Sequence, residues 1–245
     1  MNLIIDIGNS RAKAVVMHGD TLCKEYVAWA FDDALLENIL AEYPTTLSRA
    51  IIASTRGDEE RVSEMVEKHI ERVVIFKPAT TPIPLNNHYH TPETLGADRL
   101  AAAVGAQAMY PACDIMIVDF GTAITIDFVE GGAFKGGNIS PGVTTRFRAL
   151  ADYTARLPRC YATEEVLSYG RTTQEAIEQG VMRGVEYEIR GYAETFLQKN
   201  AKKCIIFTGG DAKYFVKRIK NTIFADCEPV IFGLNRILNY NAEKI

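Results

Sequence analysis

The sequence has few of the features that mark secreted, metal-binding or membrane proteins. Its five cysteines are an odd number and contain no Cys-x-x-Cys pair, so they predict neither a disulfide framework nor a zinc site. The apolar stretches are too short to span a bilayer, so we expect no membrane association. A formal net charge of −4 argues against a nucleic-acid binder, which usually carries a basic face. Together these absences predict a cytoplasmic globular protein.

What the sequence does contain is a repeated segment. Residues 3–20, LIIDIGNSRAKAVVMHGD, align without a gap with residues 116–133, MIVDFGTAITIDFVEGGA. Apolar positions alone could match by chance, since many strands look alike. Here an Asp, a Gly and a closing turn are in register as well. We interpret the segments as two copies of one β-hairpin, which predicts an N-terminal half over 1–110 and a C-terminal half over 111–245.

The remaining patterns alternate between strands and helices. The proline-rich segment 78–92 is expected to be an ordered loop or a linker, because proline suits neither a helix interior nor a central strand. Strands joined by crossover helices predict an α/β protein with helices on the sheet faces. We expect helices at 32–43, 58–70 and 95–110, through most of 156–197, after the Gly-Gly pair at 209–210 and at 230–240, and strands at 49–55, 72–78 and 204–208.

The Asp-x-Gly sequence in each hairpin suits a site for a nucleotide and a metal ion. Glycine lets backbone amides approach a phosphate, and Asn9, Ser10 and Thr122 can donate hydrogen bonds to phosphate oxygens. The carboxylates of Asp6 and Asp119 repel phosphate but can hold a cation that bridges to it. Two ordinary hairpins with Asp-Gly turns are the alternative. The repetition in register favours the phosphate site.

A third element follows the two hairpins. In FTGGDA, residues 207–212, a strand ends at Gly209 and Gly210, where backbone amides could lie against a nucleotide. A tight turn explains a Gly-Gly pair equally well, so the weight of this element comes from its position after the hairpins. His88 and His90 have no acidic or cysteine partner at ligand spacing, so loop polarity is favoured over a metal site.

The order hairpin, hairpin, strand-Gly-Gly resembles the phosphate and adenosine motifs of the acetate-sugar kinase, Hsp70 and actin superfamily. Within it, the chain is similar nearly end to end to type III pantothenate kinases. The resemblance rests on DIGNSRAK (6–13), LGADR (95–99), DFGTAITID (119–127), GGNISPG (136–142), TTQEAI (172–177) and FTGGDA (207–212). It implies two duplicated ribonuclease-H-like halves with a nucleotide cleft between them, and a homodimer. It also implies phosphorylation of pantothenate by ATP, the first step toward coenzyme A, with Mg²⁺ and a monovalent cation, K⁺ or NH4⁺.

The resemblance further implies roles for single residues. Asp98 would be the general base, and Arg99 would bind the acceptor carboxylate with its forked guanidinium. Asp119 would hold the monovalent cation, and Asp6 would organise Mg²⁺ through water. The implied substrate-binding residues are Tyr89, Gly96, Ala97, Asp98, Arg99 and Thr173, and the implied ATP-binding residues are Asp6, Ile7, Gly8, Asn9, Ser10, Arg11, Ala12, Lys13, Thr122, Gly209 and Gly210.

Several of these residues also have ordinary structural explanations. From the residues alone, Asp98 and Arg99 could be a solvated pair on a helix, Tyr89 could be loop packing, and Thr173 could be the N-cap of the helix QEAIEQGV. Lys13 would add charge at the phosphates only if it faces the cleft. Two other functions compete with the pantothenate kinase: a kinase for a sugar or acetate, and a non-catalytic nucleotide-binding factor. Recognition of a sugar would need clustered polar residues that the sequence lacks. The intact Asp98 argues against the non-catalytic factor.

Overall fold

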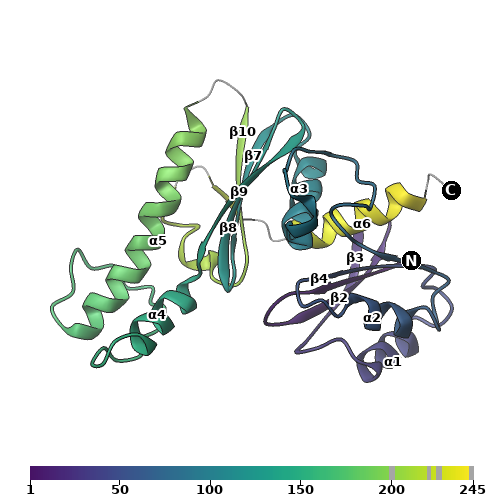
Figure 1. The fold of residues 1–245 in the computed structure, drawn as a ribbon, viewed down its shortest axis with the longest axis horizontal. Helices are drawn as coiled ribbons and strands as arrows, with labels where there is room; N and C mark the ends of the chain where they lie inside the picture. Colours follow the sequence, from purple (N-terminus) through teal and green to yellow (C-terminus); the bar gives the residue numbers. More distant parts are fainter. Residues whose placement is uncertain (199–201, 220–221, 225–227, 243–245) are drawn as a thin grey trace. The chain divides into compact units, whose positions relative to one another are not determined.

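The computed structural model describes residues 1–198, 202–219, 222–224 and 228–242, and these form two compact units (Figure 1). The predicted division after residue 110 lies beside the first change of unit, yet the C-terminal helix belongs to the first unit rather than the second. Among the described residues, no helix combines the length and apolar character needed to cross a membrane. Unit 1 comprises Met1–Pro111, Gly132–Lys135 and Cys227–Ile245, and unit 2 comprises Ala112–Gly131 and Gly136–Asp226.

The first unit is built on a five-stranded sheet in the order β3-β2-β1-β4-β5. The central strand β1 pairs antiparallel with β2 and parallel with β4, so the first hairpin lies in the middle of the sheet. One face of β1 packs its apolar side chains against α1 and α2. The elements are β1 (Asn2–Ile7), β2 (Ala12–His18), β3 (Thr21–Ala28), α1 (Asp33–Glu42), β4 (Arg49–Ser54), α2 (Glu59–Val66) and β5 (Arg72–Ile75).

Two further helices of the first unit, α3 (Ala97–Met109) and α6 (Pro229–Ala242), pack closely against each other. The contact needs glycine on both helices: a Cβ on Gly105 would lie 2.0 Å from the Pro229 oxygen, and one on Gly233 would lie 1.8 Å from the Ala101 oxygen. At the sheet, the buried Asn2 donates a 2.7 Å hydrogen bond to the side chain of Asn235 in α6. This packing holds α6 in the first unit despite its distance along the chain.

The second unit repeats the sheet order of the first. Its strands run β9-β8-β7-β10-β11, with antiparallel β7–β8 and parallel β7–β10 and β10–β11 ladders. The equivalent order in the two sheets agrees with the predicted duplication. A short strand, β6, is added to the edge at β9. The elements of the second unit are β7 (Asp114–Phe120), β8 (Ala123–Glu130), β9 (Ala133–Pro141, of which residues 133–135 belong to the first unit), α4 (Val143–Asp152), α5 (Thr173–Leu197), β10 (Lys203–Thr208), β11 (Thr222–Phe224) and the 3-10 turn η2 (Ala212–Tyr214). β6 (Asn86–Asn87) and the 3-10 turn η1 (Pro92–Thr94) belong to the first unit.

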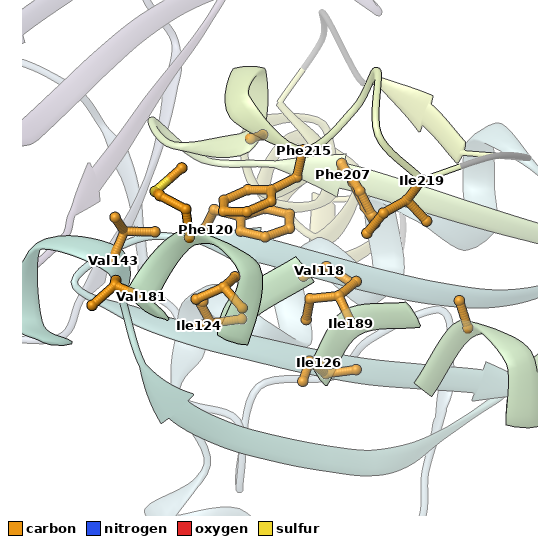
Figure 2. Close-up of a cluster of buried hydrophobic side chains, with 14 of the residues drawn as sticks. Val118, Phe120, Ile124, Ile126, Val143, Val181, Ile189, Phe207, Phe215 and Ile219 are labelled. Carbon is orange, nitrogen blue, oxygen red and sulfur yellow. The ribbon is translucent and has the colours of Figure 1, made fainter. Parts of the chain in front are cut away.

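The core of the second unit lies between its sheet and α4 and α5 (Figure 2). Phe120 at the end of β7 lies at its centre, stacked on Phe215 and edge-on to Phe207, each with ring centroids 5.0 Å away. These aromatic contacts fix the end of β7 against the chain that follows β10. The backbone around the second hairpin and the Gly-Gly turn is therefore held by packing.

Two helix predictions in this unit were wrong. Residues 153–172 form no helix. Pro158 interrupts them, and two of their backbone groups are bound by the buried Gln179 of α5, which accepts from Leu167 N and donates to Glu165 O, both at 3.0 Å. After the Gly-Gly pair the chain forms only η2 and turns, with hydrogen bonds such as Tyr214 N to Asp211 O that span three residues.

The gapless alignment of the two hairpins was also wrong beyond the turn. Gly8 N donates to Arg11 O, whereas Gly121 N donates to Ala123 O, so the first turn is one residue longer. Both hairpins still begin alike, with Asp-x-Gly at the end of the central strand. Their second strands are offset by one, and Gly19 then corresponds to Gly131; both glycines have φ of 60°.

Candidate active site

The first hairpin presents its loop at the end of the central strand β1. Gly8 is half-buried, and Asn9, Ser10 and Arg11 are exposed at the turn. Asp6 lies directly opposite Lys13 in the β1–β2 ladder, so the two side chains share one face of the sheet. Exposed hydrogen-bond donors at the turn thus closely follow the Asp6 carboxylate along the chain. Donors of this kind can bind a phosphate, and a carboxylate can hold a cation that bridges to it.

Lys13 is held by two glutamates of its own unit. Its ammonium forms ion pairs with Glu228, just before α6, and with Glu25 of β3 at 3.3 Å. Burial lowers the pKa of Lys13, but these two carboxylates outweigh burial and raise the pKa above its usual value. In this structure the charge of Lys13 is therefore directed to acidic side chains of its own unit. Glu228 and Glu25 were not predicted, because their proximity depends on the tertiary fold.

The LGADR segment forms the start of α3. Gly96 is the N-cap, and a Cβ there would lie 2.5 Å from the Asp98 carboxylate oxygen Oδ1. A side chain at 96 would therefore displace the Asp98 carboxylate from its place over the helix start. Asp98 is half-buried, and its Oδ1 accepts a 2.8 Å hydrogen bond from Arg99 N. The same carboxylate would be within reach of an acceptor hydroxyl at this end of the helix.

Arg99 lies beneath the proline-rich loop. Its side chain is 6% exposed, and its guanidinium carbon is 5.7 Å from the centroid of the Tyr89 ring. This is a cation–π contact, so the structure brings together two residues implied for the substrate. The solvated helix pair considered for Asp98 and Arg99 does not describe Arg99, which is buried.

A cavity of about 500 Å³ in the first unit reaches this helix start. Its volume lies in the range of small-molecule sites. Thr55, Phe76 and Lys77 follow the ends of β4 and β5, where ligands often bind in α/β sheets, and this position was the signal that sequence reasoning overlooked. The lining residues are Ser54, Thr55, Gly57, Glu59, Phe76, Lys77, Pro78, Ala79, Thr80, Pro92, Glu93, Thr94, Leu95, Gly96 and Ala97.

The second unit brings its hairpin and the Gly-Gly turn together. Thr208 lies beside Asp119 in the β7–β10 ladder, and a Cβ on Gly209, whose φ is +90°, would lie 2.3 Å from Asp119 Oδ1. The Asp119 carboxylate thus rests on the backbone of Gly209. Thr122 is exposed, and its carbonyl accepts hydrogen bonds from Gly142 N at 3.0 Å and from the Thr145 hydroxyl at 2.7 Å.

The donor set for a cation in either unit is small. Among the described residues, no three His, Cys, Asp or Glu side chains gather as in a multidentate metal site. A carboxylate such as that of Asp119 or Asp6 is a hard oxygen donor that suits Mg²⁺ or a monovalent cation. A cation at one of these carboxylates would take its other ligands from backbone carbonyls, water or the nucleotide.

Thr173 lies at the start of α5 but does not cap it. The N-cap is Thr172, whose hydroxyl accepts from Glu175 N at 3.1 Å while the Glu175 carboxylate accepts from Thr172 N. The N-cap alternative for Thr173 was therefore wrong by one residue. Thr173 is the first residue of the helix and is exposed, which leaves its hydroxyl available to a ligand.

The repeated sheet, with an Asp-x-Gly hairpin at the centre of each copy, defines the class of kinases and ATPases with the actin-like fold. Two solved structures share the fold. A conserved protein assigned to the Baf family of transcriptional activators from Campylobacter jejuni has a TM-score of 0.63 at 23% identity, over 98% of this chain and 99% of that one. A protein described as an N-acetylmannosamine kinase from Listeria monocytogenes has a TM-score of 0.58 at 14% identity, over 98% and 99%.

Sequence comparison assigns the chain within this class. The sequence profile of type III pantothenate kinase matches residues 2–195. The type III pantothenate kinase of Phocaeicola vulgatus is 44% identical over 246 residues, which cover 98% of this chain and 99% of that protein. This chain belongs to the type III pantothenate kinase family.

Proposed function

We propose that this protein transfers the γ-phosphoryl group of ATP to pantothenate and forms 4′-phosphopantothenate, the first step of coenzyme A biosynthesis. The full-length similarity to type III pantothenate kinases carries the proposal. The first unit supports it, because the half-buried Asp98 and the buried Arg99 adjoin at the start of α3, beside a cavity large enough for the acceptor. A kinase for a sugar or acetate remains the competing function, and the acceptor assay below separates the two.

Asp98 acts as the general base in this proposal. In-line transfer requires the acceptor hydroxyl to be aligned with the γ-phosphorus, and a carboxylate can orient the hydroxyl and accept its proton late in the step. Arg99 binds the acceptor carboxylate, and its burial makes this attraction stronger than at an exposed arginine. Tyr89, Gly96, Ala97 and Thr173 complete the acceptor site.

The phosphates of ATP are bound by the hairpin Asp6–Lys13, by Thr122 and by the turn at Gly209 and Gly210. Asp6 would hold Mg²⁺ through water, and the ion would supply positive charge that offsets the charge developing on the transferred phosphoryl group. Asp119 would hold K⁺ or NH4⁺. For Lys13 to reach a phosphate it must leave Glu228 and Glu25, so ATP binding competes with these ion pairs.

We also propose a homodimer formed through the second unit. The segment after α4 and the side of α5 expose large apolar side chains, which a monomer rarely leaves in contact with water. Thr173 borders this segment, so a partner subunit could bring the residue to its acceptor site. The exposed side chains are Tyr153, Tyr161, Val166, Tyr169 and Tyr187.

A cytoplasmic location stays a prediction. The four described cysteines are free in the structure, and Cys227 lies outside the described residues.

Mass spectrometry of a reaction with ATP, Mg²⁺ and pantothenate tests the function, with K⁺ present or replaced by Na⁺. We expect phosphorylated pantothenate that depends on K⁺. Asp98→Asn should abolish the product and keep ATP binding, whereas the control Asp33→Asn, at an exposed position on α1, should retain activity. Absence of product from folded, ATP-binding wild type, or turnover of a sugar or acetate instead, would contradict the proposal. Turnover by Asp98→Asn would remove Asp98 from the role of base.

A further inference from the structure

The loop that carries Tyr89 is attached to the start of β9. Asn86 and Asn87 pair in parallel with Ala133 and Phe134, and His88 N donates to the Phe134 carbonyl at 3.0 Å. Residues 132–135, which include the start of β9, belong to the first unit, as the loop and α3 do. Two short segments that are distant in sequence therefore fix the backbone just before Tyr89.

The side chain of Phe134 continues this attachment. Phe134 is fully buried, and its ring centroid lies 6.2 Å from that of Tyr89 at an interplanar angle of 36°. Tyr89 N donates a 3.0 Å hydrogen bond to the Asn87 side chain, which fixes the backbone at the base of the ring. The orientation of the Tyr89 ring is thus set from below by Phe134 and at its backbone by Asn87.

Tyr89 in turn contacts the guanidinium of Arg99. The contacts form a series in which Phe134 supports Tyr89 and Tyr89 supports Arg99. A guanidinium binds a carboxylate with two parallel hydrogen bonds only when its plane is correctly turned. Tilting the Tyr89 ring would turn this plane, because a cation–π contact depends on where the cation lies over the ring face.

We propose that Phe134 is a positioning residue for recognition of the acceptor carboxylate. Phe134 is fully buried, and no motif discussed above includes it. It acts through the Tyr89 ring on the orientation of Arg99. The inference rests on the proposed function, because it takes the acceptor to be a molecule whose carboxylate is read by Arg99.

The test compares Phe134→Leu with wild type on two acceptors. Pantothenate carries the carboxylate, and pantothenyl alcohol has a hydroxymethyl group in its place. We expect Phe134→Leu to lower kcat/KM for pantothenate roughly tenfold, the scale of losing one aromatic or cation–π contact. The change should be in KM rather than kcat. The KM for ATP and kcat/KM for the alcohol should stay at wild-type values.

Phe128→Leu is the matched control. Phe128 lies in β8 of the second unit, is partly buried against the core of that unit, and its ring centroid is 5.9 Å from that of Phe196. The Phe128 variant should change stability without changing the ratio of the kcat/KM values for the two acceptors. If Phe134→Leu does not fold, Phe134→Met is the second variant, because its unbranched side chain has a similar volume and adapts better to an irregular space while still removing the ring.

An equal loss of kcat/KM for both acceptors in the Phe134 variant would overturn the inference, because it would indicate a structural effect that does not act through the orientation of Arg99. An unchanged pantothenate KM would overturn it as well. The ratio of the two Kd values is also measured by calorimetry, which needs no turnover. Wild type that binds pantothenate without phosphorylating it would refute the proposed function alone, and the Kd ratio then decides the role of Phe134. Wild type that binds neither acceptor would refute both.

Discussion

Replacing Gly233 with alanine should force apart two helices that now touch backbone to backbone. A Cβ at this position of α6 would lie 1.8 Å from the Ala101 oxygen in α3, about 1.2 Å inside the 3.0 Å limit of real Cβ contacts. The obstacle is a backbone carbonyl within a helix, so no side chain can rotate away. The helices must separate, and α3 carries Asp98 one turn before Ala101.

The cost follows from two opposing effects. Alanine gains about 1 kcal/mol over glycine in a helix interior. Overpacking in a core typically costs about 1–3 kcal/mol and sometimes more. Because the overlap is with backbone on both sides of the contact, we expect the upper end of the overpacking range, about 3 kcal/mol, which leaves a net loss of about 2 kcal/mol after the helix gain. For a chain of this size that lowers Tm by roughly 4–8 °C.

Thermal unfolding and steady-state kinetics check this prediction together. A shift of about 1 Å at a catalytic group can reduce the rate about 100-fold, so kcat should fall by up to that factor. The control is Gly191→Ala in α5, where a Cβ would meet nothing within 4 Å, and Tm should rise slightly. A Gly233→Ala protein with wild-type Tm and kcat would refute the reasoning that this contact positions Asp98.

Three further outcomes follow from single groups. Burial, together with the Glu42 carboxylate, raises the pKa of Tyr26 to about 12. A pKa raised on folding gives stability that is complete below pH 10 and lost toward pH 12, so Tyr26→Phe should weaken the pH dependence of the free energy of unfolding in urea over that range. An unchanged pH dependence would contradict this. Thr172→Ala removes the capping box of α5 and should cost about 1 kcal/mol in urea, while Thr172→Asp should cost little. Exposed Cys23 should react with a thiol reagent at pH 8, whereas Cys204, whose pKa burial raises to about 11, should react only on unfolding; peptide mapping that finds equal labelling would contradict this.

Much of the fold could be predicted because local patterns decide it. The apolar run of residues 3–5 before Asp6 marks the central strand. Both ends of α1 lie within one residue of the predicted ends, because the N-cap and the spacing of apolar residues are local signals. The helix predicted through most of 156–197 begins only at Thr173. Pro158 is a local signal against a helix in the first part, whereas the hydrogen bonds of Leu167 and Glu165 with the Gln179 side chain are not revealed by the segment itself.

The candidate site shows the same distinction. Gly96 and Asp98 can be recognised as a motif from the sequence alone, because the two residues that contact each other are only two positions apart. The sequence does not reveal that Arg99 is buried, that it contacts Tyr89, or that Phe134 supports Tyr89, because these residues lie in separate segments of the chain. Their proximity depends on the pairing of β6 with β9, which two residues alone do not predict.

By itself, the sequence determined the repeated hairpins, the α/β class and the family, because these depend on residue order and on local spacing. The tertiary structure decided which charges neutralise each other and which helices touch. Lys13 turns to Glu228, and Gly233 admits the carbonyl of Ala101, because chain segments more than a hundred residues apart are packed together. Packing of that kind is cooperative, and it is fixed only when the whole unit has folded.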